Sequence, residues 1–520
     1  MITEDQSEVV AFLSSPVTHG VEHVETIETH ASILFLAGQR AWKLKRAVRY
    51  DYLDFSTVAR RHAMCAAELS INRRTAPQLY RGIVAVTRAD AGGLAIGGSG
   101  TPVDWLVSMN RFDQDALLDR LAAHSALEVS MMPALAVAMA RLHVDAAERP
   151  GHGGSAGMVW VVEGNAAGFA EYGTGVLDRD ACQQLTSDAR AALTTHEALL
   201  ESRRTLGLVR QSHGDLHLRN IVLLDGKPTL FDGIEFNDDI ACIDILYDLA
   251  FLLVDLWRRE LPRHANVVWN SYLAELQQFE GLALMPLFLS CRAAVRAKTS
   301  ATAATLQADP ERRQQLQAAA RAYLALAQRL LHPAPPCLIA VGGLSGSGKS
   351  TLARELAPLV GAAPGAVVLR SDDLRKRLSG VHPLQRLDAA GYRSDISLRV
   401  YATQADRAEL VLRAGHSVIV DAVFARASDR EAIQRRATAA SVPFVGLWLD
   451  APLDALLLRV SQRGADASDA DVAVVRRQVA EGTGGIGWHR VDASTAPAQV
   501  LNNAMGVLRS MAAIRVGPGR

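Results

Sequence analysis

Residues 343–350 read GLSGSGKS, and they fit the pattern G-x-x-x-x-G-K-[ST] at every fixed position. The apolar residues CLIAVGGL predict a buried strand before the loop, and KSTLARELAPLV predicts a helix after it. A glycine-rich loop between a strand and a helix is the arrangement that wraps phosphate groups with backbone N–H groups. The alternative is a chance turn of glycine and serine, which the flanking strand and helix do not favour.

This loop predicts a role for each of its residue types. Its three glycines let backbone N–H groups turn toward phosphate oxygens, and the following helix adds its positive N-terminal end. Lys349 is expected to reach the β- and γ-phosphates, and Ser350 is expected to ligate Mg²⁺. We therefore expect ATP or GTP to bind through Gly343, Ser345, Gly346, Ser347, Gly348, Lys349, Ser350 and Thr351.

The chain around the loop alternates between apolar strands and amphipathic helices. The segments GAVVLRSDD, HSVIVDAVF and PFVGLWLDA predict strands, and helical segments such as SLRVYATQADRAELVLRAG separate them. Such alternation predicts a parallel sheet that is covered by helices on both faces. We therefore expect an α/β P-loop domain over residues 337–520.

Carboxylates follow two of the predicted strands, at the sheet edge where ligands bind in open α/β folds. Asp372 can accept the proton of an acceptor hydroxyl, and Arg375 can bind an anionic group of that acceptor. Asp421 can hold the Mg²⁺ shell or act as a nearby base. The structural alternatives are a helix N-cap for Asp372 or Asp373 and a strand-end turn for Asp421. One of the paired aspartates can cap the helix while the other takes part in catalysis.

Two arginines, Arg459 and Arg463, lie four residues apart and so share one face of a predicted helix. They lead into GADASDA, whose composition is typical of a flexible segment. One interpretation is a lid that closes on the triphosphate, and the other is a solvated helix end. The sequence does not decide between them.

The second half of the chain resembles the small P-loop kinases, a group that includes gluconate kinases, zeta-type toxins and the kinase part of polynucleotide kinases. The resemblance covers about residues 337–500 and rests on the phosphate loop and on SDDLR at 371–375. It implies that Asp372 is the base that activates the acceptor and that Arg375 binds the acceptor. No sensor motif of a ring ATPase is visible, so we expect group transfer rather than mechanical work.

The segment HPAPP at 332–336 precedes the P-loop region. Its three prolines stiffen the chain and prevent a helix from continuing. A chain of 520 residues is too long for one core, so two or three domains are expected. We predict a first domain at residues 1–331, a linker at 332–336 and a second domain at 337–520.

Residues 213–220 of the first half read HGDLHLRN, which has the spacing H-x-D-x-x-x-x-N of a kinase-type catalytic loop. In such a loop Asp215 orients and deprotonates an acceptor hydroxyl, and Asn220 ligates Mg²⁺. The segment TLFDGIEF then places Asp232 after a short strand, where a second metal ligand belongs.

The residues that precede this loop offer a lysine–glutamate pair that can position the α- and β-phosphates. Lys43 and Lys45 share one face of a predicted strand, and Glu68 lies in the next predicted helix. The chain has only six lysines among its 55 basic residues, and two of them lie in this strand, which argues against an ordinary solvated edge. The sequence leaves open which lysine contacts the phosphates.

The first half resembles the aminoglycoside-phosphotransferase family, whose catalytic loop reads H-G-D, over about residues 21–330. This resemblance implies an α+β, protein-kinase-like region with a small lobe at about 21–112 and a large lobe at about 113–331. It also implies that Asp244 and Asp248 are structural hydrogen-bond acceptors. The whole chain looks like bacterial fusions of a phosphotransferase-like domain with a P-loop kinase domain.

The first half departs from the kinase pattern in front of the catalytic loop. No G-x-G-x-x-G lies between its first two predicted strands, where ETHAS at 28–32 forms the turn, and GIEF follows Asp232. Both departures weaken the expected grip on the nucleotide, but they leave the catalytic groups intact. A slow or specialised kinase and a domain that binds ligand without turnover are both compatible with this sequence.

Composition limits the partners and the compartment. Net charge is zero and aromatic residues make up 5% of the chain, so a basic, aromatic strand-binding surface is not favoured, although a local basic groove is compatible with both figures. The N-terminus lacks a signal-peptide core, and the most apolar window, residues 248–257, is too short to span a bilayer. Five scattered cysteines without a C-x-x-C pair suit a reducing compartment, so we expect a cytoplasmic protein without a membrane partner.

Together these motifs predict an ATP- and Mg²⁺-dependent phosphotransferase that acts on a hydroxyl of a sugar, a sugar acid or an aminoglycoside-like compound. One alternative is a polynucleotide 5′-hydroxyl kinase that uses Asp372 and Arg375. The other is a regulatory ATPase whose first half is a non-catalytic sensor. The acceptor pocket of the first half is expected between residues 240 and 330, close to Asp239, Asp244 or Asp255.

Overall fold

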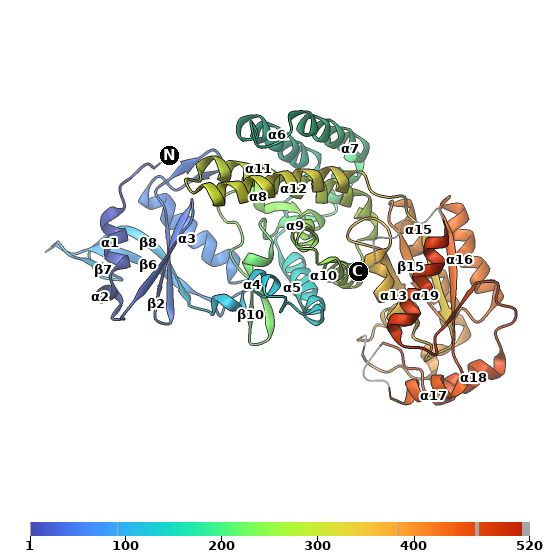
Figure 1. Cartoon of the computed structure of the whole chain (residues 1–520). Helices are drawn as coiled ribbons and strands as arrows, with labels where there is room; N and C mark the ends of the chain where they lie inside the picture. The colour runs from blue at the N-terminus through green and yellow to red at the C-terminus, as the bar shows by residue number, and fades with distance from the viewer. Residues whose placement is uncertain (1, 91, 383, 463–466, 512–520) are drawn as a thin grey trace. The chain divides into compact units, whose positions relative to one another are not determined.

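The computed structural model describes residues 2–90, 92–382, 384–462 and 467–511 (Figure 1). The chain forms two compact units, one made of Met1–Gly168 with Arg190–Asp255 and the other of Phe169–Ala189 with Leu256–Arg520. Among the described residues, no helix combines the length and the apolar character needed to cross a bilayer. The division into domains at residues 332–336 stays a prediction, since the second unit also takes in the helices that precede this linker.

The first unit contains a six-stranded antiparallel sheet. The alternating pattern of residues 21–50 predicts three antiparallel strands, and the structure has β1, β2 and β3 there. Phe35, Leu44 and Leu106 from three of the strands are fully buried and share one core cluster. In spatial order the strands are β1 (Val24–Glu28), β2 (Ser32–Ala37), β3 (Arg40–Lys45), β8 (Thr101–Asn110), β6 (Tyr80–Arg88) and β7 (Leu94–Ile96).

Helix α3 (Val58–Asn72) packs against β8 of this sheet. It begins at Thr57, whose side-chain oxygen accepts a hydrogen bond from the backbone N–H of Arg60. Arg61 and Glu68 lie on the buried face of the helix, and Arg61 Nε pairs with Asp104 of β8 at 2.8 Å. This pairing fixes the rotation of the helix, so Glu68 faces the sheet.

The rest of the first unit surrounds a segment of short strands that carries HGDLHLRN. That segment has β9 (Val209–Gln211) paired with β12 (Cys242–Asp244), and the hairpin β10 (Ile221–Leu224) with β11 (Lys227–Leu230). Helices α4 (Leu118–Ala123), α5 (Met132–Asp145), α8 (Asp238–Ala241) and most of α9 (Ile245–Arg258) complete it.

Helix α6 (Gly154–Tyr172) begins inside residues 150–157, where the glycine-rich sequence predicts only a flexible loop. Gly153 and Gly154 have φ angles of 64° and 61°, a region that favours glycine, and they turn the chain into the helix. The sequence pattern predicts helices over residues 176–207, and helix α7 (Arg179–Thr205) lies there.

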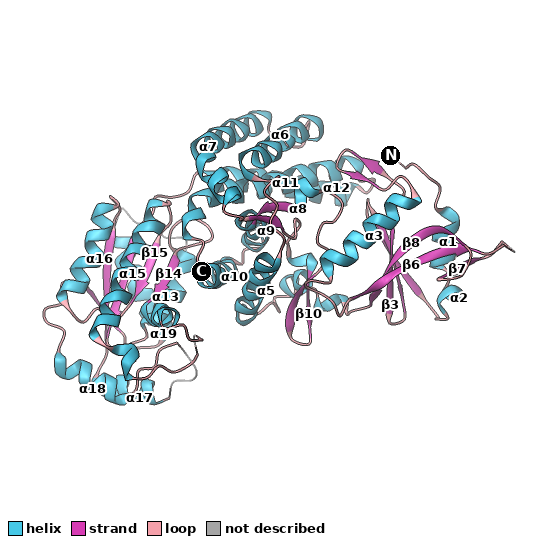
Figure 2. Ribbon diagram, turned by 180° about the vertical axis from the view of Figure 1, so that it is seen from behind, coloured by secondary structure: helices cyan, strands magenta, loops and turns pink. Residues whose placement is uncertain are grey.

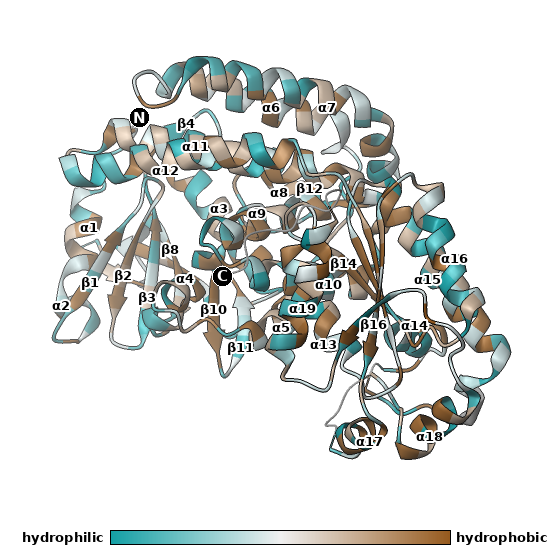
Figure 3. Ribbon diagram, turned by 45° about the vertical axis from the view of Figure 1, so that its right-hand side comes forward, coloured by the Kyte–Doolittle hydropathy of each residue, from teal (hydrophilic) through white to brown (hydrophobic). Residues whose placement is uncertain are grey.

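The second unit holds a five-stranded parallel sheet with helices on both faces, so the α/β prediction is confirmed (Figure 2). Its strands are rich in apolar residues, which Figure 3 shows in brown on β14 and β16. The spatial order is β14 (Val367–Arg370), β15 (Val418–Asp421), β13 (Leu338–Gly343), β16 (Phe444–Asp450) and β17 (His489–Asp492).

Two groups of helices flank the sheet. Leu352 and Val500, from α13 and α19, join the core cluster on one face, whereas α14, α15 and α16 pack together away from it. The bounds are α13 (Lys349–Leu356), α14 (Ser371–Leu378), α15 (Ser394–Arg413), α16 (Ala427–Ala439), α17 (Leu453–Ser461), α18 (Val472–Glu481) and α19 (Pro497–Ser510).

Helices that precede the proline-rich linker also belong to this unit. They are α10 (Pro262–Leu276), α11 (Met285–Leu306) and α12 (Pro310–Leu331). Helix α10 covers the outer edge of β14: Asn270 Oδ1 accepts the N–H of Val368 at 2.7 Å, and Asn266 Nδ2 donates to the carbonyl of Ala366 at 3.1 Å. The edge strand therefore has side-chain partners where a neighbouring strand would otherwise pair.

Candidate active sites

Lys43 on β3 joins two carboxylates in the first unit. Its Nζ lies 2.8 Å from Glu68 Oε1 and 2.5 Å from Asp232 Oδ1, so the strand, helix α3 and the segment after β11 meet at one ammonium group. Asp232 has a φ angle of 62°, which is uncommon for a residue other than glycine and is typical of functional positions. The sequence proposed all three residues, and the structure brings them together.

Lys45 lies two residues further on the same strand face, but it is only 1% exposed. Its Nζ is 2.6 Å from Glu68 Oε2, and it also donates to Glu235 Oε1. Burial alone would raise the pKa of Glu68, yet the ammonium groups of Lys43 and Lys45 lower it to about 2. Lys45 therefore stabilises a buried carboxylate pair, and Lys43 is the lysine that reaches Asp232.

The catalytic-type loop presents a half-exposed carboxylate. Asn220 Nδ2 donates to Asp215 Oδ2 at 3.1 Å and to the Asp215 carbonyl at 2.9 Å. His217 Nε2 lies 3.3 Å from the same carboxylate, whose side chain is 37% exposed. Asp215 is thus oriented from within its own loop and still accessible to a ligand.

A carboxylate of helix α9 holds the backbone of the loop in place. Asp248 accepts hydrogen bonds from the backbone N–H groups of His213 at 3.1 Å and Gly214 at 2.9 Å. Gly214 has a φ angle of 82°, and an added Cβ there would lie 3.1 Å from the Ile240 carbonyl, so only glycine fits without strain. These bonds make the buried Asp248 a structural acceptor, the role that the sequence implied.

Two further aspartates serve the same scaffold. Asp244 pairs with Arg203 through Nε at 2.7 Å and Nη2 at 2.9 Å, and Asp255 accepts the Leu218 N–H at 3.0 Å. Of the three aspartates proposed for the acceptor pocket, only Asp239 is exposed, and it contacts His152 at 3.3 Å.

The oxygen donors of this loop suit a hard divalent cation. The Phe231 N–H donates to the Asn220 carbonyl at 3.0 Å, which sets Asp232 beside Asn220. Carboxylate and amide oxygens are the ligands that Mg²⁺ takes in proteins. Asn220 and Asp232 could therefore hold Mg²⁺, and Lys43 Nζ lies against Asp232 at 2.5 Å.

The β1–β2 turn replaces the expected glycine-rich loop. The Ser32 N–H donates to Thr29 Oγ1 at 2.9 Å, which closes the turn without glycine. Desolvation lowers the pKa of His30, and the nearby charge of Asp215 acts in the opposite direction. The His30 ring also lies 6.1 Å from Tyr50 and 6.4 Å from Tyr52, measured between centroids. Sequence reasoning did not identify this aromatic group, because its members are separated along the chain.

The P-loop of the second unit has the backbone that the sequence motif predicts. Gly346 has a φ angle of 85°, and an added Cβ would lie 2.7 Å from the Leu456 carbonyl of α17. Gly348 has a φ angle of 90° and open space beside it. Lys349 Nζ donates to the Leu344 carbonyl at 3.0 Å, so its side chain folds back over the loop.

Two hydroxyl groups and one carboxylate lie at this loop. Ser347 Oγ is buried and has no hydrogen-bond partner among the described residues. Ser350 Oγ donates to Asp421 Oδ2 at 2.5 Å, and Asp421 is 4% exposed at the end of β15. A hydroxyl beside a carboxylate fits the first coordination shell of Mg²⁺. Thr351 is exposed on the next position of α13.

Asp372 and Asp373 both lie in the first turn of α14, and neither is its N-cap, which is Arg370. The N-cap interpretation is therefore wrong for both. Asp373 pairs with Arg370 Nη1 at 3.2 Å. Desolvation by the surrounding protein raises the pKa of Asp372, and the charge of Asp421 raises it further.

Arg375 lies close to this carboxylate on α14. Its Nη1 donates to the Gly391 carbonyl at 2.8 Å and to Ser397 Oγ at 3.2 Å, and its guanidinium lies 4.8 Å above the Tyr392 ring. Its Nε is buried without a hydrogen-bond partner in the part of the chain that the structure describes. Arg375 is thus fixed in orientation and keeps one donor for a ligand.

The two arginines proposed for a lid differ in what the structure shows. Arg459 is half-buried on α17, the helix that packs against the P-loop through Leu456. Arg463 lies outside the described residues, two positions after the end of α17.

Three polar contacts in this region were missed by sequence reasoning. Gln478 of α18 accepts the N–H of Ser345, a P-loop residue, at 2.9 Å. Lys376 of α14 donates to both oxygens of Asp469 at 2.7 Å, and Tyr392 donates to Asp469 at 2.9 Å. The sequence signal for the Asp469 contact was Lys376, one of only six lysines among the 55 basic residues of the chain.

Comparisons with known proteins give matches to the C-terminal region and to nearly the whole chain. Residues 338–483 match the family model described as an AAA domain. An adenylyl-sulfate kinase of Myxococcus xanthus is 35% identical over 127 residues, which cover 22% of this chain and 59% of that enzyme. The C-terminal region is thus a P-loop kinase domain.

Two solved structures show weaker likeness. A gluconokinase from Sinorhizobium meliloti is 21% identical with a TM-score of 0.26, and it covers 34% of this chain and 95% of its own. A choline kinase from Cryptosporidium parvum is 10% identical with a TM-score of 0.39, and it covers 63% of this chain and 95% of its own.

Relatives from Mycobacterium match nearly the whole chain. Rv2004c, an uncharacterized protein of Mycobacterium tuberculosis, is 30% identical over 506 residues, which cover 94% of this chain and 96% of the relative. This length includes both the kinase-like region and the P-loop domain. The chain therefore belongs to the protein family that includes Rv2004c of Mycobacterium tuberculosis.

Proposed function

We propose that the protein is an ATP- and Mg²⁺-dependent phosphotransferase whose P-loop domain phosphorylates a hydroxyl of a small molecule. The observation that carries this proposal is the state of Asp372, a carboxylate with a raised pKa beside Asp421 and the P-loop. A carboxylate with that proton affinity, next to a nucleotide site, is suited to general base catalysis. The similarity to an enzyme named for a small acceptor, adenylyl sulfate, supports the acceptor class.

The residues of the P-loop domain divide the reaction between them. Lys349 and the loop N–H groups would bind the phosphates, and Ser350 and Asp421 would hold Mg²⁺, which neutralises charge on the transferred group. Asp372 takes the proton of the acceptor hydroxyl as its oxygen attacks the γ-phosphorus. Arg375 offers Nε to an anionic or polar group of the acceptor.

The kinase-like region would carry out the same phosphoryl transfer with a different set of residues. Lys43, rather than Lys45, would contact the α- and β-phosphates, because it alone touches Asp232 as well as Glu68. Asp215 would orient and deprotonate a hydroxyl, with Mg²⁺ held by Asn220 and Asp232.

The test is an ATP-consumption assay of the full chain against sugars, sugar acids, adenylyl sulfate, aminoglycosides and 5′-hydroxyl oligonucleotides. Lys349→Ala removes the ammonium group that would contact the transferred phosphate, so kcat/KM should fall roughly 10²–10³-fold. Asp372→Asn should lower kcat by about 10²–10⁴-fold, the usual contribution of a general base. Asp373→Asn is the matched comparison, since this neighbour pairs with Arg370 Nη1 at 3.2 Å, and it should lower kcat less than Asp372→Asn does.

Parallel variants assign the product to one half. If Asp215→Ala removes all product and Lys349→Ala none, then the P-loop domain is not the catalyst and the proposal fails. Phosphorylation of oligonucleotides alone would overturn the small-molecule acceptor.

A further inference from the structure

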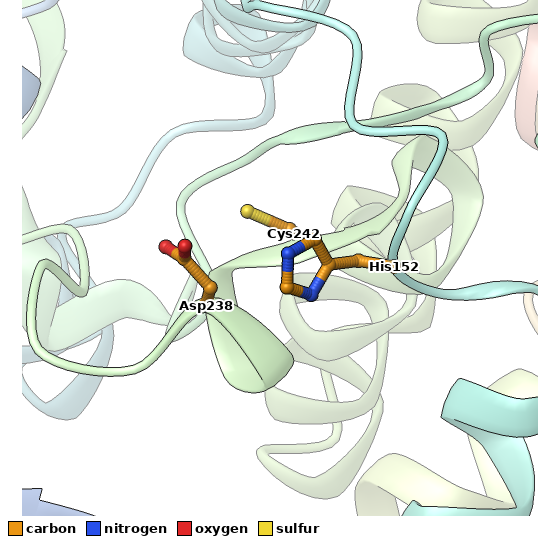
Figure 4. A group of neighbouring side chains, drawn as sticks. All are labelled: His152, Asp238 and Cys242. Atoms are coloured by element: carbon orange, nitrogen blue, oxygen red, sulfur yellow. The ribbon is translucent and has the colours of Figure 1, made fainter.

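Three side chains outside both nucleotide sites converge in the first unit. His152 precedes α6, Asp238 begins α8, and Cys242 begins β12. One ring nitrogen, one carboxylate oxygen and the sulfur all lie within 4.8 Å of one another. Figure 4 shows the carboxylate and the sulfur on the same side of the imidazole ring.

The donor set is characteristic of a borderline-soft transition metal. Imidazole nitrogen, carboxylate oxygen and thiolate sulfur are the three ligand types that Zn²⁺ takes, at about 2.0–2.3 Å. Ligand atoms at those distances around a tetrahedral ion are about 3.5 Å apart. Rotamer adjustments that shorten these separations by about 1 Å would therefore complete a site with three protein ligands and one open position.

A fourth residue supports the imidazole in the way that metal-ligating histidines are usually supported. Asp239 Oδ1 lies 3.3 Å from His152 Nδ1, so a hydrogen on Nδ1 is donated to this carboxylate. The lone pair of Nε2 is then available for a metal ion. The pairing also fixes the orientation of a ring that is only half-buried.

Charge around the group is mixed. Burial, together with the charge of Asp238, raises the pKa of Cys242 to about 11. The charge of Arg149, whose Nη2 donates to Gln211 Oε1 at 3.1 Å, acts in the opposite direction. The carboxylates of Asp238 and Asp239 offset the repulsion between this guanidinium and a metal ion. Binding replaces the S–H bond of Cys242 by a metal–sulfur bond and releases the proton to solvent.

The group lies next to a cavity of about 20 Å³. Each of the three residues is followed in sequence by a residue that lines this cavity, namely Gly153, Asp239 and Ile243. The cavity adjoins the catalytic-type loop, because β12 pairs with β9 and the Ser212 N–H donates to the Ala241 carbonyl at 2.8 Å. A metal ion bound there would link α8 and β12 to the turn before α6.

We propose that His152, Asp238 and Cys242 bind one divalent transition-metal ion of the zinc class next to this cavity. The site is separate from the Mg²⁺ positions proposed above, whose ligands are all oxygen atoms.

The test measures metal on the full-length protein without an activity readout. The protein is stripped with a chelator, titrated with Zn²⁺, and analysed by elemental mass spectrometry after desalting. In parallel, Co²⁺ replaces Zn²⁺, since a cobalt–thiolate bond gives a near-ultraviolet charge-transfer band. The wild type should retain about one equivalent and show the band.

Variants locate the bound metal. Cys242→Ser should lose the band, His152→Asn should lose the retained equivalent, and Asp239→Asn should bind roughly 10–100-fold more weakly. Cys182→Ser, a buried cysteine on α7, is the control and should behave as the wild type. Because the His152 side chain is half-buried, His152→Asn should fold, and it tests the site even if Cys242→Ser does not fold.

Two results would overturn the proposal: a wild type that retains no more zinc than His152→Asn, or a cobalt complex without a thiolate band. Lys349→Ala keeps the outcome independent of the phosphotransferase proposal, since it should lose phosphotransfer and retain the metal.

Discussion

Asp372 and Asp373 are neighbours in sequence, yet the fold gives them different chemistry. Asp373 pairs with Arg370, whereas Asp372 faces the charge of Asp421 and is desolvated by its surroundings. Two carboxylates in a row cannot be told apart by composition or spacing. Only their positions on α14 show which one has the raised pKa that is typical of a functional site.

This raised pKa predicts the pH dependence of the reaction. A base must be ionised, so kcat/KM should fall as the pH drops through the pKa of Asp372, and this acid limb should lie above the range of an ordinary aspartate. The measurement is a pH–rate profile with a good acceptor at saturating Mg²⁺. An acid limb at the ordinary value near 3.8, or one that persists unchanged in Asp372→Asn, would argue against this role.

Lys45 predicts a large effect on stability. Lys45→Ala would leave Glu68 and Glu235 buried without this ammonium group, so the free energy of unfolding should fall by about 3–5 kcal/mol. Urea denaturation followed by circular dichroism would measure the loss. Lys227→Ala, at an exposed turn, is the matched control and should stay within about 0.5 kcal/mol of the wild type. Equal, small losses for both variants would contradict the structural role.

At the scale of elements, strand β14 shows how a helix from an earlier part of the sequence protects a sheet edge. Its outer side bonds to Asn266 and Asn270 of α10, and its last residue, Arg370, leads directly into the turn that carries Asp372. The edge contact and the candidate base therefore belong to one continuous piece of structure.

Asn270 is the more informative of the two asparagines to change. Asn270→Ala would leave the N–H of Val368 without its acceptor, and the free energy of unfolding of this unit should fall by about 1–2 kcal/mol. Thermal unfolding monitored by circular dichroism would detect the shift. Asn503→Ala, on the exposed face of α19, is the control and should leave the midpoint unchanged. A neutral Asn270→Ala would mean that water replaces the contact at no cost.

At the scale of the whole molecule, the boundary between the two compact units does not coincide with the proline-rich segment at residues 332–336. Helices α10, α11 and α12 precede residues 332–336, yet they belong to the same compact unit as the P-loop domain. Prolines show where a helix must stop, but they carry no information about which surfaces pack together. The helical composition of residues 240–331 likewise says nothing about which sheet those helices will cover.

The sequence by itself determined both folds and most of the candidate residues, because fixed spacings encode the P-loop and the H-x-D-x-x-x-x-N loop locally. Periodicity predicted most strands of both sheets, but it missed β17 and also α6, whose start is hidden by glycines. Only the tertiary structure separated Lys43 from Lys45, assigned Asp255 to the scaffold, and brought His152 to Asp238 and Cys242. Those distinctions depend on burial and on partners from distant segments, which no local pattern contains.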